Sequence, residues 1–431
     1  MDQERLQSRF RQKGRIPLQI EPMRESENKI AAKRTNNAVT LLITGATGFL
    51  GSHITEDFLK KGYSIVLLCR PGNGRSASKR MEKLFEWFDI DLTKHSNLKI
   101  LEGSLEKPNF GLNPGEYRFL VDNVDEIIHC AANTSFAEKK RAEVESSNID
   151  SMTNVLEMAS QSGCYFLHHI STAYVAGKKE GPCKEEFVET HSFHNVYEET
   201  KYRAEQTAIR ACQKYSIRLN IYRPSIVIGN SVTGKSIKFN ALYYPAKMVH
   251  YLKNLFTRDL ENNGGENAAK MGVRLDSEGK MLLPIRVEKD RNGSLNVIPV
   301  DYFVNACSAI MDDCLQGGIF HIVSNKPKCL EELIGYMSRY YGIQGLRGVL
   351  KSEFLGTPKT ALEKLVDNFM HMYMPYMRDK RVFSDENTQR ILGKQGITCP
   401  ELSYDMFDRC LNYALEADWG KNFKSDFQCR P

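Results

Sequence analysis

The stretch Thr44-Gly45-Ala46-Thr47-Gly48-Phe49-Leu50-Gly51 follows an apolar run and precedes a helical pattern. A strand, a glycine-rich turn and a helix in this order indicate a dinucleotide-binding turn, whereas the same glycines elsewhere would indicate only a loop. We expect Gly45 to allow the sharp turn, Gly48 to let the main chain approach a pyrophosphate, and Gly51 to let helix and strand pack closely. The amides at the helix start then face the anion, helped by the helix dipole.

Apolar runs and helical patterns continue to alternate after this turn. The further predicted strands are 65–69, 98–105, 125–132, 165–172 and 219–222. This alternation predicts an α/β fold with a Rossmann-type doubly wound parallel sheet over residues 38–235. We expect residues 296–316 to return to this domain, and residues 236–295 and 317–431 to form a smaller, mainly helical lobe that binds the substrate.

The composition is that of a soluble globular protein: 431 residues, 41% hydrophobic and 26% charged. No apolar run approaches the roughly 20 residues of a membrane-spanning helix, and the first residues lack the apolar core of a signal peptide. Eleven cysteines without a CxxC pair indicate neither a metal site nor a disulfide framework. We therefore expect a cytoplasmic protein with no metal ion and no transmembrane segment.

Residues 1–37 are basic, with nine Lys or Arg against five Asp or Glu, and hold four of the chain's six net positive charges. Because the rest of the chain has little net charge, we expect no nucleic-acid partner. The polar, weakly periodic pattern favours a flexible solvated arm. The alternative is an arm that docks on an acidic partner or a membrane surface. We expect a chain starting near Thr35 to keep its stability and activity.

The residues after the second predicted strand bear on the choice of cofactor. An enzyme that prefers NAD usually has an acidic residue there to hold the ribose 2′-hydroxyl. This chain has Arg70 and then Arg75, Lys79 and Arg80, with no acidic residue before Glu82. Guanidinium groups pair well with a 2′-phosphate. We therefore expect NADPH/NADP to be preferred over NAD, with Arg70 and Arg80 contacting the phosphate.

Tyr197 and Lys201 lie four residues apart at the start of a predicted helix, which puts them on one helical face. The pair comes after the strand that ends in Ser171 and Thr172, and ligands of such sheets bind outside the carboxyl ends of the strands. A phenol so placed can donate a proton to a carbonyl oxygen that receives hydride. We expect the nearby ammonium to lower the pKa of this phenol.

Several motifs together resemble the extended short-chain dehydrogenase/reductase superfamily and, within it, the thioester reductase and fatty acyl-CoA reductase group. The superfamily motifs are TGATGFLG (44–51), HCAA (129–132), Asn148, STAYVAG (171–177), YEETK (197–201) and RPSIVIG (223–229). The group is marked by LLCRPGNGRSASKRM (67–81) and NVIPVDYFVNAC (296–307). The resemblance covers about residues 38–330.

The resemblance implies a catalytic triad of Thr172, Tyr197 and Lys201, with Ser171 as the less favoured hydroxyl. The implied NADP contacts are Gly45, Thr47, Gly48, Phe49, Leu50, Gly51, Arg70, Arg80, Ser104, Leu105, Ala131, Ala132, Asn148, Tyr197, Lys201, Pro224, Ser225 and Ile226. Ser104 departs from the family, which usually has an Asp that contacts the adenine there. A serine hydroxyl can still make a hydrogen bond at this position.

The implied function is NADPH-dependent reduction of an acyl thioester, carried on coenzyme A or an acyl-carrier protein, to an aldehyde and in a second step to an alcohol. One alternative is an epimerase, dehydratase or ketoreductase acting on a sugar nucleotide or another soluble carbonyl compound. Another is a non-catalytic NADP sensor, a class that usually loses the Tyr-Lys pair. Peripheral membrane contact and the oligomeric state stay open.

Two smaller features complete the sequence-based expectations. The run 370–377, Met-His-Met-Tyr-Met-Pro-Tyr-Met, favours the core of the helical lobe, with a lining for an acyl chain as the alternative. His168 and His169 on the fifth predicted strand are expected to be packing residues rather than ligands.

Overall fold

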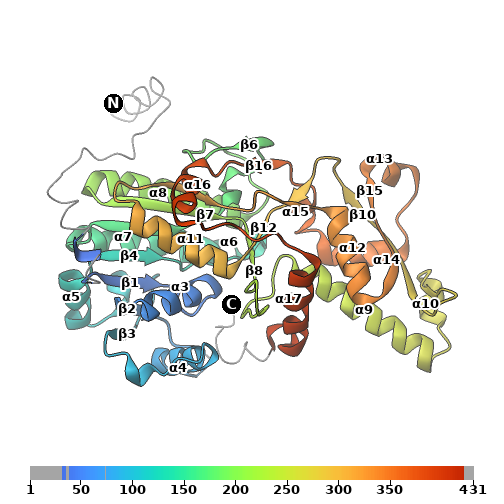
Figure 1. Cartoon of the computed structure of the whole chain (residues 1–431), viewed down its shortest axis with the longest axis horizontal. Coiled ribbons are helices and arrows are strands. Elements are labelled where there is room, and N and C mark those ends of the chain that lie inside the picture. The colour runs from blue at the N-terminus through green and yellow to red at the C-terminus, as the bar shows by residue number, and fades with distance from the viewer. Residues whose placement is uncertain (1–31, 35–37, 73, 422–431) are drawn as a thin grey trace.

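The computed structural model describes residues 32–34, 38–72 and 74–421 (Figure 1). Its centre is a seven-stranded sheet in the order β13-β7-β5-β4-β1-β2-β3, in which every neighbouring pair is parallel. The strands are β1 (Thr40–Thr44), β2 (Ser64–Cys69), β3 (Leu98–Glu102), β4 (Glu126–His129), β5 (Phe166–Ile170), β7 (Arg218–Pro224) and β13 (Gly318–Ile322). This arrangement confirms the predicted Rossmann-type fold.

Helices cover both faces of the sheet because successive strand residues point to opposite sides. In β1, Leu41 and Ile43 belong to one core cluster and Leu42 to another. The first cluster includes residues of α3 (Phe49–Lys60), α4 (Ala77–Trp87), α11 (Val300–Asp313) and α16 (Glu386–Leu392). The second includes residues of α5 (Pro114–Asn123), α7 (Ser151–Gln161) and α8 (Val196–Tyr215). The chain enters α7 through α6 (Arg141–Glu145) and the π-helical turn η4 (Ser146–Asp150).

A second lobe has its own apolar core and extends away from the sheet (Figure 1). Its helices are α9 (Tyr243–Asn262), α10 (Glu266–Lys270), α12 (Leu330–Tyr341), α13 (Lys351–Gly356), α14 (Ala361–Met370), α15 (Met374–Met377) and α17 (Tyr404–Glu416). It also contains a three-stranded sheet of β15 (Ile343–Leu350), β10 (Met281–Lys289) and β9 (Arg274–Leu275). The lobe is mainly helical, but the three-stranded sheet within it was not predicted from the sequence.

Short elements complete the chain. The paired strands are β6 (Gly181–Cys183) with β16 (Arg381–Phe383), β8 (Ile226–Ile228) with β12 (Val297–Pro299), and β11 (Ser294–Leu295) with β14 (Lys328–Cys329). The 3-10 turns are η1 (Leu92–Lys94), η2 (Pro108–Gly111), η3 (Glu138–Lys140), η5 (Ala173–Ala176), η6 (Gly393–Gln395) and η7 (Asp418–Gly420). Because β16 pairs with β6, a late part of the chain lies beside the segment that follows β5.

The domain boundary expected at residue 317 needs correction. Strand β13 pairs in parallel with β7 and is the seventh strand of the main sheet rather than part of the lobe. Helix α16 packs on the same face as α11, with Ile391 and Leu392 in the core of the dinucleotide-binding domain. An apolar strand can pair with any strand whose edge is free. The position of β13 in the sequence therefore could not show whether it belongs to the main sheet or to the lobe.

The end of the N-terminal segment packs against the sheet. Arg34 is 6% exposed, and its guanidinium donates to both carboxylate oxygens of Glu126 at 2.8 and 3.1 Å. It also lies 4.9 Å from the ring centre of Phe166. The neighbouring Lys33 makes an exposed ion pair with Asp125. A chain starting near Thr35 would therefore leave Glu126 buried without its cation, which reverses the expectation that such a truncation keeps its stability. The rest of the predicted arm, residues 1–31 and 35–37, lies outside the described residues.

Two kinds of feature are absent from the described ranges. No helix within them is both long and apolar enough to cross a bilayer. The same residues contain no group of three or more His, Cys, Asp or Glu side chains arranged to hold a metal ion.

Candidate active site

The glycine turn between β1 and α3 leaves no room for side chains. Gly45 has a φ of +75°, and a Cβ atom there would lie 2.5 Å from the backbone nitrogen of Ala131. A Cβ atom on Gly51 would overlap the carbonyl oxygen of Gly45. Gly48 precedes the first turn of α3, and its amide donates to Gly45 at 2.8 Å. The turn thus brings the start of α3 against β1 and the end of β4, as a pyrophosphate site requires.

A cavity of about 250 Å³ opens beside this turn. The sequence-predicted site residues that line it are Gly45, Gly48, Phe49, Leu50, Gly51, Ala132, Thr172, Tyr197, Lys201, Pro224, Ser225 and Ile226. Ser171, the less favoured hydroxyl, lines it as well. The predicted residues outside its lining are Thr47, Arg70, Arg80, Ser104, Leu105, Ala131 and Asn148. The cavity therefore joins the glycine turn to the three predicted catalytic side chains.

The predicted triad lies where β5 ends and α8 begins. Thr172 follows β5, and its hydroxyl oxygen lies 3.3 Å from the amide of Tyr174, which donates to it. Tyr197 is in the first turn of α8, which Asn195 caps by accepting from the amide of Glu198 at 3.0 Å. Lys201 comes one turn later, and its ammonium donates to the carbonyl oxygen of Ile170 at 2.7 Å.

Burial sets the ionisation of these groups. It raises the pKa of Tyr197 above that of a free phenol, while the hydrogen bond with the Thr172 hydroxyl acts in the opposite direction. Burial lowers the pKa of Lys201 to about 8. This differs from the expectation that Lys201 depresses the pKa of Tyr197, because in this structure the ammonium is directed to Ile170. The phenol is thus held protonated, which is the form that a proton donor needs.

Two histidine side chains of the main sheet, His129 of β4 and His169 of β5, lie close to Lys201. His169 Nε2 lies 3.4 Å from the ammonium of Lys201. The His169 ring stacks on His129 at 5.6 Å, and His129 hydrogen-bonds Thr44 at 2.9 Å. Burial is the main cause of the low pKa of both rings, so they are neutral and add no positive charge beside the lysine. The neighbouring His168 contacts Glu126 and Tyr222.

Aromatic residues from distant parts of the chain enclose Tyr197. The ring of Phe136 lies 6.0 Å from that of Tyr197 and 5.5 Å from that of Tyr376. The hydroxyl of Tyr376 donates to Glu198 at 2.8 Å and accepts from Asn195 at 2.7 Å. Tyr376 belongs to the methionine-rich run 370–377, so that run contacts the helix start that carries Tyr197.

Asn148 belongs to the π-helical turn η4 and does not line the cavity. It is 2% exposed, and its amide donates to the backbone oxygen of Asn133 at 3.0 Å and to the hydroxyl of Thr200 at 2.9 Å. Its side-chain oxygen accepts from the amide of Asn133 at 2.7 Å. Asn148 therefore ties the segment after β4 to the residue that precedes Lys201. Turns of π-helix are frequent at functional sites.

The expected 2′-phosphate region contains an acidic residue that sequence reasoning did not weigh. Arg70 pairs with Glu106 at 3.1 Å, and Ser104 donates to the same carboxylate at 2.5 Å. Arg80 is 3% exposed and donates to the backbone oxygen of Arg70. Arg70 is thus the more accessible of the two predicted phosphate ligands, and Glu106 competes for it.

Lys238 is a cavity residue that sequence reasoning also missed. It lines the cavity, and its ammonium donates to the hydroxyl of Thr134 at 2.8 Å. Burial lowers its pKa. No carboxylate of the described ranges forms an ion pair with it. A lone lysine within a predicted insertion carries no signal in one sequence, so only the tertiary contact with the segment after β4 reveals it.

Comparison with known proteins places this site in a family. Residues 43–307 match the family model described as Male sterility protein. Part of the linear gramicidin synthase of Brevibacillus parabrevis is 22% identical over 86% of this chain, which spans 7% of that protein. Fatty acyl-CoA reductase 1 of Rattus norvegicus is 28% identical over 31% of this chain and 28% of its own length. This chain therefore spans only a small part of these relatives.

A solved structure has the same fold. It is the terminal R domain from the myxalamid PKS-NRPS biosynthetic pathway, with a TM-score of 0.66 and 22% identity over 89% of this chain and 92% of that one. The similarity covers the main sheet and extends into the second lobe, since it spans nearly the whole of both chains.

Proposed function

Because this chain belongs to the Male sterility protein family of extended short-chain dehydrogenases/reductases, we propose that it is an NADPH-dependent reductase of acyl thioesters. The observation that carries the proposal is a single cavity lined by the glycine turn and by Thr172, Tyr197 and Lys201. The thioester would arrive on coenzyme A or on an acyl-carrier protein. Fatty acyl-CoA reductase and peptide-synthase relatives support this substrate class.

The residues present fit a dinucleotide. Because Gly45 and Gly51 carry no side chain, the turn packs closely against Ala131 and the start of α3, and the first amides of α3 can face a pyrophosphate. Lys201 lines the same cavity and would hold the ribose next to the nicotinamide. A reduced nicotinamide supplies hydride to a carbonyl carbon, and the protein must then neutralise the charge that develops on the carbonyl oxygen.

The three side chains divide that task. Tyr197 donates its proton to the oxygen, and Thr172 donates a hydrogen bond that strengthens as charge develops there. Lys201, whose ammonium donates to the carbonyl oxygen of Ile170, would hold the nicotinamide ribose in place for hydride transfer. The tetrahedral hemithioacetal then breaks its carbon–sulfur bond, so that thiol and aldehyde leave. A second hydride and proton would convert the aldehyde to an alcohol.

The proposal is tested by following NADPH and thiol together. With acyl-CoA substrates of several chain lengths, we expect NADPH absorbance to fall as the thioester is reduced. A chromogenic disulfide should detect one released thiol for each substrate molecule that accepts its first hydride. Product analysis then separates aldehyde from alcohol. Oxidation of NADPH by ketones or sugar nucleotides without thiol release would favour the epimerase or ketoreductase alternative. Cofactor binding without turnover on any of these substrates would favour the sensor.

Cofactor preference should depend on the Arg70–Glu106 pair. Arg70→Ala removes the guanidinium expected to pair with the 2′-phosphate, so we expect NADPH to lose about tenfold in affinity while NADH binds nearly unchanged. Glu106→Gln frees Arg70 and removes a carboxylate that would repel the phosphate, so NADPH should bind more tightly. Titration calorimetry with both cofactors measures this. Equal dissociation constants for NADPH and NADH in the wild-type protein would refute the assignment.

A further inference from the structure

The cavity that contains Tyr197 is positively charged. Two of the residues that line it, Lys201 and Lys238, carry an ammonium group, and none of its described lining residues is an Asp or a Glu. Burial raises the pKa of the Cys130 thiol in the same lining, and the charges of both lysines oppose this shift, so both ammonium groups lie close to that thiol. A cationic cavity without a carboxylate of its own favours an anionic ligand.

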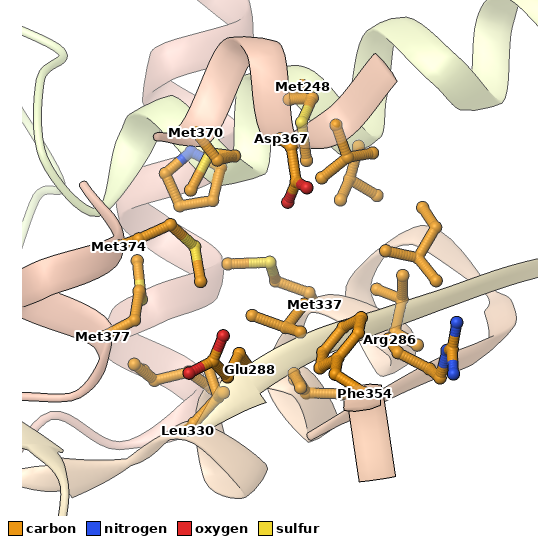
Figure 2. Close-up of a pocket in the computed structure, with 18 of the residues that line it drawn as sticks. Met248, Arg286, Glu288, Leu330, Met337, Phe354, Asp367, Met370, Met374 and Met377 are labelled. Atoms are coloured by element: carbon orange, nitrogen blue, oxygen red, sulfur yellow. The ribbon is translucent and has the colours of Figure 1, made fainter. Parts of the chain in front are cut away.

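Other charges in the interior of this protein have partners. A second cavity, of about 60 Å³, lies inside the helical lobe, and Figure 2 shows charged side chains among the methionines that line it. Each of these charges is paired: Arg286 with Glu363 at 2.7 Å, Glu288 with Arg378 at 2.6 Å, and Asp367 with Lys359. The buried Lys328 likewise pairs with Glu332 at 3.0 Å and Glu401 at 2.7 Å. Lys238, which forms no ion pair with a described carboxylate, differs from all of them.

The backbone at Lys238 is fixed at the boundary between the two domains. Ile237 packs in the core of the dinucleotide-binding domain and Phe239 in the core of the lobe. The buried Ser236 hydroxyl accepts from the amide of Lys238 at 3.2 Å and donates to its carbonyl oxygen at 2.8 Å. The ammonium itself donates to Thr134 at 2.8 Å. The charge is thus held in place before a ligand arrives, which lowers the cost of binding one.

The cofactor leaves Lys238 available. The diphosphate of a dinucleotide would lie at the amides that begin α3, and Lys201 would hold the ribose. Thr134 supplies one neutral acceptor, whereas an ammonium has three N–H donors. Lys238 belongs to the segment that leads into α9 of the lobe, and Leu242 of the same segment also lines the cavity. The anion expected at Lys238 is therefore part of the substrate.

We propose that Lys238 binds a carboxylate carried by the acyl group of the substrate, so that monothioesters of dicarboxylic acids are preferred over thioesters of simple fatty acids. This inference rests on the proposed function and specifies its substrate class. A carboxylate accepts strong, charge-assisted hydrogen bonds from an ammonium. The phosphate of a pantetheine arm is separated from the thioester sulfur by the whole arm, whereas Lys238 and Lys201 lie close to one thiol. A carboxylate on the acyl group fits this position better.

Paired ligands that differ in one charge test the inference without requiring turnover. Carboxyalkyl thioethers of coenzyme A cannot be reduced, and their methyl esters have a similar shape without the charge. In a series with increasing numbers of methylene groups, we expect the wild-type protein with NADP to bind the best acid about tenfold or more tightly than its ester, the usual scale for a hydrogen bond to a charged group. Lys238→Met should remove this preference and bind the esters as the wild-type protein does. Titration calorimetry measures both.

Lys235→Met is the matched control. Lys235 belongs to the same segment, but its side chain is 45% exposed and does not line the cavity, so this variant should keep the preference for acids. Lys238→Arg keeps a cation and should retain part of the preference, which separates the charge from a general effect of changing this side chain. In turnover, Lys238→Met should lower kcat/KM about tenfold or more for the best dicarboxylic monothioester and leave its methyl ester unaffected.

Equal affinity of the wild-type protein for every acid and its ester would overturn the inference. An equal loss of acids and esters in Lys238→Met would do so as well, because a contact with the pantetheine phosphate has that effect. A tenfold loss of NADP affinity in the same variant would show that Lys238 serves the cofactor instead. Failure of the proposed function looks different: the preference for carboxyalkyl thioethers would persist, but no acyl thioester would release thiol.

Discussion

Tyr197→Phe should lower turnover of an acyl thioester by about 100-fold or more, the usual scale for losing a positioned proton donor. The change removes one hydroxyl from a ring that packs near Phe136, so the fold should not change. Dissociation of NADPH should change little, because the phenol acts on the carbonyl oxygen of the substrate. Steady-state rates and cofactor titration measure the two effects separately.

Tyr302→Phe is the matched control for this experiment. Tyr302 is 2% exposed in α11 and does not line the cavity that contains Tyr197, so the same chemical change away from the candidate site should leave the rate unaltered. A wild-type rate in Tyr197→Phe would show that another group donates the proton. A comparable loss in both variants would point to a general effect of removing a buried hydroxyl.

Arg34→Met should destabilise the protein by about 3–5 kcal/mol, the usual cost of removing one partner of a buried ion pair. Arg34 and Glu126 are both nearly inaccessible to solvent, and the variant leaves the carboxylate beside His168 alone. Lys33→Met is the matched control, because Lys33 pairs with Asp125 at the surface, where an ion pair contributes about 0–1 kcal/mol. Urea unfolding of the three proteins at neutral pH gives the comparison.

The same pair predicts how this difference depends on pH. Burial alone would raise the pKa of Glu126, but the hydrogen bond with His168 and the charge of Arg34 outweigh it and lower the pKa to about 2. A carboxyl group whose pKa is depressed on folding contributes stability above its unfolded pKa, which is about 4.3, and loses it as the pH falls toward its folded pKa. The difference in unfolding free energy between wild type and Arg34→Met should therefore narrow as the pH falls from about 5 toward 2, across the interval between the unfolded and the folded pKa of Glu126. A gap that widens with acidity would contradict the assignment.

Much of this protein could be predicted from local sequence. The turn 44–51 specifies its own conformation, because only glycine fits where Gly45 meets Ala131 and where Gly51 meets Gly45. The strands that follow are short apolar runs separated by helical patterns, and connections of this kind lead to parallel sheets. Tyr197 and Lys201 could be assigned as a pair because four residues make one helical turn. The positions of Thr172, Tyr197 and Lys201 at one cavity agree with that reasoning.

Other features depend on contacts between distant parts of the chain. Strand β13 joins β7 across about 100 residues, and Arg34 reaches Glu126 across 92, so neither partner is visible in a local pattern. Glu106 lies beside Arg70 only because β3 pairs with β2 and brings the residues after the two strands together. The ionisation of Tyr197 also depends on tertiary contacts. Its pKa is set by burial and by the direction of the Lys201 ammonium, whereas local sequence shows only that Tyr197 and Lys201 are four residues apart.

The methionine-rich run 370–377 shows most clearly which features local sequence leaves undecided. Its composition indicates an adaptable apolar surface, and local sequence determines that much. Its role depends on which cavity each side chain faces: Tyr373, Tyr376 and Met377 line the cavity that contains Tyr197, while Met370, Met374 and again Met377 line the second one. Only folding divides the run in this way, because packing against α8, α9 and α12 decides the direction of each side chain. Local sequence therefore determined the dinucleotide turn, the sheet and the spacing of Tyr197 and Lys201, and tertiary packing determined the space available to a substrate.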